Sequence, residues 1–415
     1  MDAAGRRALI EELCSFEGRG PGTDAERRAA NWLAAGLRDA GRRVTVEPTY
    51  VHPQYALAIA LHLAVAIAGS LIAALLSPAA GFALVLLAAV SLYLDQSTRA
   101  YLLRRLLFRR ASQNVVSPGG RPEAPVRVVL SAHYDAGRTG LVFGPRSVAL
   151  AHRLAERWRL LLGPIRLLYW AGVVPLLAIS GLRMAGAGGA ALSAVQLAPI
   201  ALLLVAIALL VDITLSEVVP GACDNASGVA AVLSAAQDLD ADPPAGLDLW
   251  VVLPGAEEAN AQGMARFVAA HRDDLDPERT LFVNLDSVSY GEVHCERGEG
   301  AIVTYAMDSR LAEICAEVGE DTGIGSRPLR HPFHTDALPA RVRGYRAISL
   351  LGASDGVGAP YYHTHDDVPD NLDEVALTRA TAFTVALVRA IAADANLAPE
   401  PAPAGAGVRP AAHRV

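Results

Sequence analysis

The sequence predicts an α/β fold, with a mostly parallel central sheet flanked by helices and two inserted transmembrane helical hairpins. Strands and helices alternate along much of the chain, the predicted strands are nearly continuous apolar runs, and four long apolar segments interrupt the alternation. Nearly continuous apolar strands are typical of parallel strands that helices cover on both faces. The 415 residues suffice for one large domain or two smaller ones. The mean hydropathy of +0.30 is high for a wholly soluble protein.

The charge and the cysteines exclude several kinds of protein. The formal net charge is −7, so we expect no nucleic-acid partner. The four cysteines have no CxxC spacing and lie far apart, at Cys14, Cys223, Cys295 and Cys315. This pattern indicates buried or free thiols, and neither a disulfide framework nor a sulfur-rich metal site.

Residues 1–54 are expected to form the first part of the α/β domain. Their mixed and charged start predicts no signal peptide. From Arg27 to Ala40, apolar residues recur on one helical face, and Gly41 ends this helix. Arg43 to Glu47 follows as a predicted strand.

Residues 55–98 are expected to form the first transmembrane hairpin. No charged residue occurs from Tyr55 to Leu76, a length that suffices to cross a hydrocarbon layer of about 30 Å. Ser77 and Pro78 make a turn, and Ala79 to Leu94 returns as a shorter apolar run. The alternative is a set of buried core helices in a large soluble domain, but these runs are too long and too nearly charge-free for it.

Residues 160–213 repeat the pattern as the second transmembrane hairpin. Its apolar runs extend from about Leu160 to Leu182 and from Ala190 to Ile213, with a glycine-rich turn between them. Residues 99–159 and 214–397 are soluble in character. We expect these two segments to complete the α/β domain.

Arginines flank the hairpins on one side. They are Arg99, Arg104, Arg105, Arg109, Arg110, Arg153, Arg157 and Arg159. The far turns hold only Arg183. Because cytoplasmic loops of membrane proteins are rich in basic residues, the sequence predicts an integral, multi-pass protein with four spans. Its α/β domain would lie in the cytoplasm, and the lipid bilayer would be a partner.

After the second hairpin, strands and helices alternate. The predicted strands are Leu247–Leu253, Leu281–Leu285, Ile302–Ala306 and Ala347–Leu351. The predicted helices are Val229–Leu239, Ala261–Ala270, Arg310–Gly319 and Glu374–Ala393. Residues 398–415 are rich in proline, alanine and glycine, which predicts a disordered tail.

The first candidate site follows the apolar strand Val126–Leu130. His133 and Asp135 come just after it, and side chains two apart on an extended chain point the same way. A carboxylate that accepts the second N–H of an imidazole is the usual support of a metal-binding histidine. Taken alone, such a pair is more often a solvated loop start.

Four later segments contain side chains that can bind a metal. They hold Asp224 in Gly221–Gly228, Glu257 and Glu258 after Leu253, Asp286 after Leu285, and His363 in Tyr362–Asp367. Most of them follow the carboxyl end of a predicted strand, where open α/β sheets bind ligands. Residues distant in the sequence are therefore expected to converge there.

The number of candidate ligands favours two metals. The histidines and carboxylates are His133, His363, Asp224, Glu258 and Asp286. One tetrahedral catalytic zinc takes only three protein ligands and a water, whereas two metals accommodate all five if one carboxylate bridges. Imidazole with carboxylate favours two Zn²⁺ ions, although Mn²⁺ or Co²⁺ fits the same ligands.

Glu257 adjoins a candidate ligand but is not needed as one. It is therefore free to take a proton from a water that bridges the metals, as a general base. Two metals about 3.5–4 Å apart lower the pKa of such a water and polarise a carbonyl group. The predicted reaction is the hydrolysis of an amide.

Together these segments resemble the dinuclear zinc aminopeptidases of the M28 family. The matching motifs, in the family's order, are HxD at His133, DNASG at Asp224, AEE at Glu257 and Glu258, NLD at Asp286 and HTxDD at His363. Arg19 to Thr23 resembles the family's N-terminal RxPG segment. Each motif alone is weak, whereas the five together are highly specific. The resemblance covers the soluble parts of the chain and implies a zinc exopeptidase-like fold.

The resemblance also implies a role for each matching residue. One zinc would be bound by His133, Asp224 and Asp286. The other would be bound by Asp224, Glu258 and His363, so that Asp224 bridges the two ions.

The catalytic residues that the resemblance implies are Glu257 and Asp135. Glu257 would be the general acid and base, and Asp135 would support His133. The family also tends to have a cis peptide after the bridging aspartate, which here is Asp224–Asn225. The membrane hairpins depart from the secreted members of the family.

Some neighbouring residues have other interpretations. His365 competes with His363 as a ligand, and we prefer His363 because it occupies the HT position of the motif. His331 and His334 are expected to be structural or to line a pocket. Asp336 lies where the family often has a pocket residue, but we do not expect it to bind metal. Cys223 is expected to be a small buried residue.

The sequence therefore predicts a membrane-anchored dinuclear zinc exopeptidase, an aminopeptidase. It would hydrolyse the N-terminal amide bond of a peptide substrate by a metal-bridging hydroxide, with Glu257 as general base. A single-zinc acyltransferase like the glutaminyl cyclases is one alternative. A non-catalytic membrane receptor or transporter-associated protein that retains the fold is another. The residue preference, the physiological substrate and the oligomeric state stay open.

Overall fold

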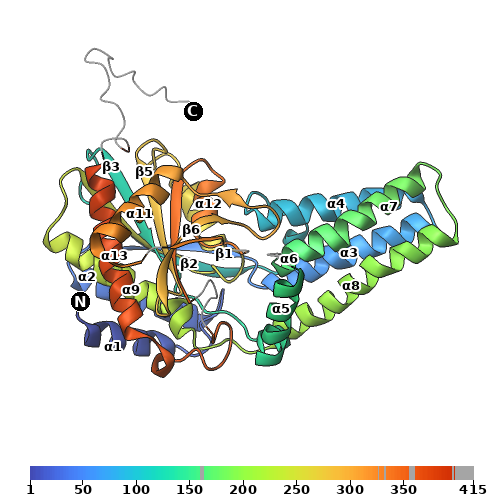
Figure 1. Cartoon of the computed structure of the whole chain (residues 1–415). Helices are drawn as coiled ribbons and strands as arrows, with labels where there is room; N and C mark the ends of the chain where they lie inside the picture. The colour runs from blue at the N-terminus through green and yellow to red at the C-terminus, as the bar shows by residue number, and fades with distance from the viewer. Residues whose placement is uncertain (159–162, 326, 331–332, 355–359, 395–396, 398–415) are drawn as a thin grey trace, which may run out of the picture.

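A computed structural model describes the chain apart from residues 159–162, 326, 331–332, 355–359, 395–396 and 398–415. A sheet domain contains the first and the last helix of the chain, and a bundle of long helices projects from it (Figure 1). The predicted disordered tail, residues 398–415, lies outside the described residues.

Within the described residues, the sheet domain is built from nine strands and the helices that cover them. The strands are β1 (Thr45–Val51), β2 (Arg110–Ser117), β3 (Val126–Ser131), β4 (Leu247–Leu253), β5 (Thr280–Asp286), β6 (Glu292–Glu299), β7 (Tyr305–Ala306), β8 (Arg327–Arg330) and β9 (Arg346–Ala353). The main helices of this domain are α1 (Ala3–Ser15), α2 (Asp24–Asp39), α9 (Gly228–Ala241), α10 (Gln262–Ala270), α11 (Ser309–Thr322), α12 (Ala337–Arg341) and α13 (Glu374–Ala393).

The bundle and its connections make up the remaining helices. They are α3 (Tyr55–Leu75), α4 (Pro78–Gln96), α5 (Pro145–Trp158), α6 (Pro164–Leu167), α7 (Val174–Met184) and α8 (Ala190–Leu215). Between α6 and α7 the chain forms the π-helical turn η3 (Leu168–Val173). The shorter turns are η1 (Leu103–Leu106), η2 (Leu141–Phe143), η4 (Ala222–Ser227) and η5 (Pro369–Asn371).

The sheet is mixed, with a parallel centre and antiparallel edges. Its order is β1-β2-β4-β3-β5-β9-β6-β7, and β8 pairs with β6. The four central strands β4, β3, β5 and β9 run parallel. The pairs β1–β2, β2–β4, β6–β9 and β6–β7 are antiparallel. The predicted α/β fold is therefore observed. Parallel pairing joins the four central strands, where apolar strands are covered on both faces, and it also joins β6 to β8.

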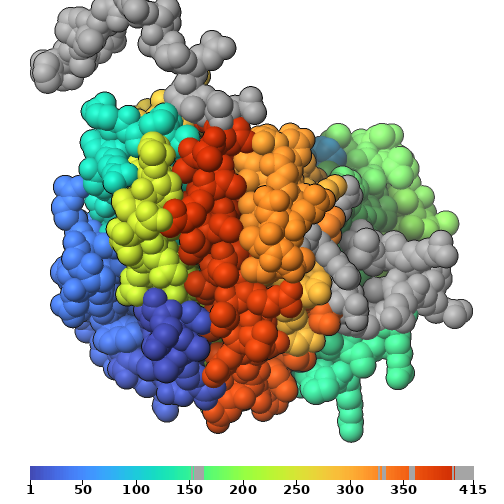
Figure 2. Space-filling view, turned by 60° about the vertical axis from the view of Figure 1, so that its left-hand side comes forward, coloured from blue at the N-terminus to red at the C-terminus, as the bar shows by residue number. Residues whose placement is uncertain are grey.

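Helices cover both faces of the sheet. On one face, α1, α2, α9, α11 and α13 share a core with the central strands. Figure 2 shows α9, α13 and α11 side by side on this face. Phe383 of α13 is completely buried in this core. On the other face, α10 and α12 pack on a smaller core around Phe267 and Phe282. The sheet edge that carries the candidate ligands is thus set in a rigid, two-sided scaffold.

One predicted strand is wrong in most of its length. Ile302–Ala306 was expected to be a strand, but only Tyr305–Ala306 pairs with β6, whereas Ile302 is buried against the bundle. The strand β6 was missed instead. It contains the buried acidic residues Glu296 and Glu299, which interrupt the apolar pattern by which strands are recognised.

The bundle has apolar side chains on its outer surface. Leu63, Leu92, Leu176 and Leu203 form its core. Many other large apolar side chains are exposed on the same helices: Leu71, Leu75, Leu86, Leu87, Val90, Leu182, Val195, Leu197, Leu204 and Val205.

Polar side chains lie inside the bundle. His62 of α3 is hydrogen-bonded to Ser91 of α4 at 2.8 Å. Arg183 donates to the side-chain oxygen of Gln196 at 2.8 Å, and Gln196 donates to the hydroxyl of Ser70 at 2.8 Å. Hydrogen bonds between polar side chains thus join α3 to α4, and α7 to α8 and α3, inside the bundle.

Five helices of the described residues are long and apolar enough to cross a membrane. Four of them are the bundle elements α3, α4, α6 to α7, and α8. The fifth, α13, contacts α9 and α11 within the sheet domain. Its apolar composition is therefore accounted for by burial in the core of that domain.

The packing of α13 predicts a large cost for truncating Phe383. The variant Phe383→Ala should lower the free energy of unfolding by about 3–5 kcal/mol, because it leaves a cavity in a packed core. The control Val375→Ala changes a side chain of the same helix that is 69% exposed, and should stay within about 0.5 kcal/mol of the parent. Thermal or denaturant unfolding measures both. Equal effects of the two variants would contradict this packing.

Candidate metal centre

The candidate ligands converge at the carboxyl edge of the parallel strands. His133 follows β3, Asp286 is the last residue of β5, and Glu258 follows β4. His363 lies in the loop after β9, and Asp224 lies in η4, which leads into α9. Parallel strands end at the same edge, so side chains from distant segments meet there.

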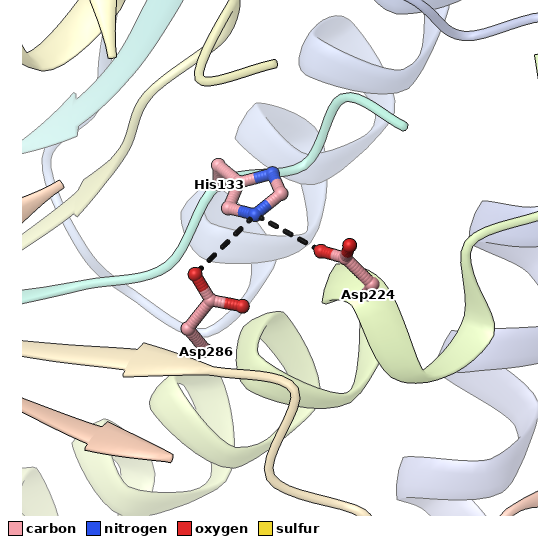
Figure 3. Close-up of side chains that lie close together, drawn as sticks. All are labelled: His133, Asp224 and Asp286. Atoms are coloured by element: carbon pink, nitrogen blue, oxygen red, sulfur yellow. Dashed lines mark ion pairs between the residues drawn. The ribbon is translucent and has the colours of Figure 1, made fainter. Parts of the chain in front are cut away.

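Two groups of three side chains could each hold a metal ion. The ligand atoms within a group lie no more than 4.8 Å apart. In the first group, His133 Nε2 lies 3.4 Å from Asp224 Oδ1 and 3.9 Å from Asp286 Oδ2 (Figure 3). In the second, His363 Nε2 lies 3.4 Å from Asp224 Oδ2 and 3.3 Å from Glu258 Oε1.

Asp224 belongs to both groups through different oxygens. Its Oδ1 faces His133 and its Oδ2 faces His363. Zinc–ligand distances of about 2.0–2.1 Å place two tetrahedral ligands about 3.3 Å from each other. The separations of 3.4 Å between Asp224 and each imidazole, and of 3.3 Å between His363 and Glu258, agree with this spacing. One carboxylate is therefore placed where it could bridge two ions.

Both histidines present the same ring nitrogen to the cluster. Nδ1 of His133 lies 3.2 Å from the carbonyl oxygen of Asp135, and Nδ1 of His363 lies 3.1 Å from that of Arg138. A carbonyl can only accept, so each Nδ1 carries a proton, which leaves Nε2 as the ring nitrogen that can bind a metal. The buried Nε2 of His363 has no hydrogen-bond partner within the described residues.

The site concentrates negative charge in a buried space. Burial raises the pKa of Glu257 well above its usual value, and the charges of Asp336 and Glu258 add to the rise. Burial likewise raises the pKa of Asp286 to about 6 and also raises that of Glu258. Carboxyl groups so close together cannot all be ionised unless cations are present.

The histidines respond in the opposite direction. Burial lowers the pKa of His363, but the charge of Glu258 and the neighbouring carboxylate of Asp224 raise it to about 10. For His133, burial also lowers the pKa, and the neighbouring carboxylates of Asp135 and Asp224 raise it well above its usual value. Both raised pKa values show that the surrounding carboxylates favour a positive charge at this site.

Asp135 supports the site mainly through the backbone of the next loop. Its carboxylate accepts the N–H of Glu257 at 3.0 Å and that of Glu258 at 3.1 Å. Its Oδ1 lies 3.6 Å from Nδ1 of His133, farther than its own carbonyl oxygen. Asp135 therefore holds the two glutamates beside His133, in addition to lying next to the imidazole.

The loop around Asp224 is held by residues that the sequence left without a role. The peptide Asp224–Asn225 is cis, which confirms that prediction. The carboxylate of Asp367 accepts the N–H of Cys223 at 2.6 Å and that of Asp224 at 3.1 Å. The side chain of Asn225 donates to the carbonyl of Leu285 at 2.9 Å, which fixes the loop against β5. The DNASG and HTxDD motifs contain these two residues, so the motifs were the signal.

Arg19 links two ligand-bearing segments. It is almost completely buried. Its guanidinium donates to the carbonyl of Tyr134 at 2.9 Å and to that of Gly221 at 2.6 Å, and it also bonds that of Pro220. The segment that resembles the N-terminal RxPG motif thus positions the chain on either side of the site.

Other candidate residues lie as follows. His365 is 57% exposed and is 3.7 Å from Glu217, so His363 and not His365 reaches the cluster. Cys223 is buried beside Asp224. Asp336 is completely buried near the site but belongs to neither group of three. His334 packs edge-on against Tyr55, and His331 lies outside the described residues.

Comparison with known proteins agrees with this geometry. The sequence matches the family model "Peptidase family M28" over residues 211–388. This range includes the candidate site residues from Asp224 to His363 but not His133. No curated protein sequence matches the chain.

Several solved structures share the fold. A Zn-dependent exopeptidase from Parabacteroides distasonis is 14% identical, with a TM-score of 0.54, and the match covers 94% of this chain and 98% of that one. BSAP, a zinc aminopeptidase from Bacillus subtilis, is also 14% identical, with a TM-score of 0.53 and coverages of 93% and 94%. A glutaminyl cyclase from Bacteroides thetaiotaomicron is 13% identical, with a TM-score of 0.54 and coverages of 94% and 97%.

The α/β fold and the matched family define the protein as a metallopeptidase. Its residues 211–388 are a peptidase family M28 domain, as the motifs indicated.

The contacts of Asp367 predict a loss of metal affinity when it is changed. Asp367→Asn removes one of the two carboxylate acceptors that hold the Asp224 loop, and should weaken Zn²⁺ binding about 10–100-fold. Competition with a chelating dye measures the affinity. The matched control is Asp366→Asn, at the exposed neighbouring position, which should bind Zn²⁺ like the parent. Equal affinities in all three proteins would contradict the role of Asp367.

Proposed function

We propose that the protein is a membrane-anchored, dinuclear zinc aminopeptidase. The observation that carries the proposal is the pair of three-residue groups that share Asp224, with Glu257 beside them. Glu257 Oε2 lies 3.9 Å from His133 Nε2, so it borders the site without belonging to either group.

The residues fit two zinc ions by their chemistry. Each ion would be held by one imidazole, one carboxylate that binds only that ion, and the shared carboxylate of Asp224. This ligand set suits zinc. Nε2 of His363 has no hydrogen bond within the described residues, and the buried carboxylates are crowded together. A bound cation would give this nitrogen a partner and neutralise the carboxylates. When bound, the two ions would acidify a water and polarise the carbonyl group of a substrate.

Glu257 would move the proton. Its raised pKa suits a group that takes a proton from the attacking water and then gives it to the leaving amine. The carboxylate of Asp135 binds the backbone N–H of Glu257 and so fixes its position. We propose peptides with a free amino end as the substrate class because the solved structures that share the fold include a zinc aminopeptidase.

Two other functions are less well supported. Glutaminyl cyclases share the fold at 13% identity. We favour the peptidase because both groups of three ligands are complete, whereas the single-zinc reaction needs only one. The same completeness argues against a non-catalytic receptor or transporter-associated protein. Zinc analysis of the purified protein separates the enzymes, since two ions per chain favour the peptidase and one favours the cyclase.

The proposed role of Glu257 predicts a specific loss of turnover. Glu257→Gln should lower kcat by about 10²–10⁴-fold on a panel of aminoacyl amides, because it removes the proton acceptor. It should leave the zinc content unchanged, since Glu257 is not a ligand in this assignment. Enzyme assays and metal analysis of detergent-solubilised protein measure both effects.

The neighbouring residue is the control for this experiment. Glu258→Gln removes a proposed ligand, so it should weaken the binding of the ion shared with His363. If Glu257→Gln retains full activity, the assignment of the general base fails. If the parent protein hydrolyses no aminoacyl amide with its zinc bound, the proposed peptidase activity fails.

We further propose that the bundle spans the membrane with four helices. Its outer surface is apolar and its interior holds hydrogen-bonded polar groups, as expected in lipid. The helix α13 would not span, because it packs in the sheet domain. The arginines at the domain end of the bundle support a cytoplasmic site by the positive-inside rule.

The proposed topology predicts the results of membrane fractionation and proteolysis. The protein should stay in the membrane pellet after an alkaline carbonate wash, because its spans are embedded in lipid. Protease added to intact cells should leave the sheet domain uncut, and protease added to permeabilised cells should cut it. Cleavage of the domain in intact cells would place it on the opposite side of the membrane.

A further inference from the structure

A buried ion pair joins the base of the bundle to the loop that carries Glu257 and Glu258. Asp95, near the end of α4, and Arg104, in η1, are both completely buried. Nε of Arg104 donates to Oδ2 of Asp95 and Nη2 donates to Oδ1, each at 2.7 Å. A bidentate pair of this kind fixes the orientation of both side chains.

This pair contacts residues 254–262, the loop between β4 and α10 together with the first residue of α10, which we call the glutamate loop. Nη1 of Arg104 donates to the carbonyl of Ala259 at 3.0 Å, immediately after Glu258. The side-chain amide of Asn260 donates to the carbonyl of Asp95 at 2.7 Å. The pair therefore binds the loop from the guanidinium and from the backbone of α4.

The other end of the first hairpin binds the same loop. The N–H of His52, just before α3, donates to the side-chain oxygen of Gln262 at 3.0 Å. Nε2 of Gln262 donates to the carbonyl of His52 at 2.9 Å and to that of Ala259 at 2.7 Å. Both connections between this hairpin and the sheet domain are thus hydrogen-bonded to the glutamate loop.

The backbone of the glutamate loop depends on such contacts. Ala256, Asn260 and Ala261 have φ angles of 54°, 83° and 48°. Residues other than glycine seldom adopt positive φ, and they keep it only where the surroundings impose it. Asp135 holds the loop from the side of the sheet, and the Asp95–Arg104 pair holds it from the side of the bundle.

We infer that Asp95 and Arg104 are positioning residues, which couple the first hairpin to the placement of Glu257 and Glu258. The inference rests on the proposed function for what the two glutamates do. Buried ion pairs are weak evidence of stability, since apolar residues often replace them without loss. The specific contribution of this pair is its contact with the loop, because a small displacement of a reacting group costs a large part of the rate.

A second buried ion pair provides a matched control. Nε of Arg127 donates to Oδ2 of Asp248 at 2.8 Å, and these side chains are 5% and 2% exposed. They lie near the start of β3 and of β4, at the sheet edge opposite the metal centre. Arg127→Met therefore removes a buried pair of similar chemistry that does not contact the glutamate loop.

The experiment uses the full-length protein in lipid nanodiscs. The variants are Arg104→Met, the double variant Asp95→Asn with Arg104→Met, and Arg127→Met. Hydrogen exchange reports on the amides of the glutamate loop, and kcat and KM are measured with aminoacyl amides, well below each unfolding temperature. Arg104→Met and the double variant should speed exchange in the loop and lower kcat by up to about 100-fold, with KM nearly unchanged. Arg127→Met should leave loop exchange and kcat like those of the parent.

The other possible results also support or overturn the coupling. If loop exchange in the Arg104 variants equals that of Arg127→Met, the coupling is overturned and the pair is only structural. If the Arg104 variants do not fold, the variant Asn260→Ala tests the coupling instead. It removes the hydrogen bond from Asn260 to the carbonyl of Asp95 and leaves the ion pair intact. Faster exchange in its loop then supports the coupling, and parent-like exchange overturns it. An inactive parent protein refutes the proposed function, while hydrogen exchange still tests the positioning of the loop.

Discussion

The carboxylate of Asp224 lies between two buried imidazoles, and each of its oxygens is 3.4 Å from one Nε2. The rest of the site is arranged around this contact. Burial of the other carboxylates raises their pKa values, and the charge of Asp224 adds to the rise. The loop that contains Asp224 must therefore be rigid. Hydrogen bonds made by Asp367, Asn225 and Arg19 hold it in place.

The fold places these groups at one edge because its central strands are parallel. The two hairpins are inserted without breaking that centre. The first separates β1 from β2, an antiparallel pair at the sheet edge, and the second lies between β3 and the Asp224 loop. The bundle is nevertheless in close contact with the sheet domain. Arg166 donates to the carbonyl of Gly300 at 2.8 Å, and Ile302 packs into the bundle core.

Much of this fold could be predicted from local patterns. The apolar runs of β3, β4, β5 and β9 and the periodic helices around them are signals contained in short segments. The antiparallel edges could not be predicted, since pairing direction depends on partners distant in the chain. Neither could β6, because Glu296 and Glu299 are buried within it by contacts that only the folded chain provides. The fifth apolar helix, α13, shows the same limit: composition alone does not tell a core helix from a membrane span.

For the site, the sequence by itself determined the residue types, their order and their place at strand ends, because metal ligands and strand patterns are local properties. The tertiary structure decided which of them meet. It brought His363 and not His365 to the cluster, turned both Nδ1 atoms to carbonyl groups, and gave Asp367 and Arg104 their contacts. Apart from the contact of His133 Nδ1 with Asp135, those choices depend on distances between segments more than a hundred residues apart, as between Asp224 and His363. No local pattern contains such distances.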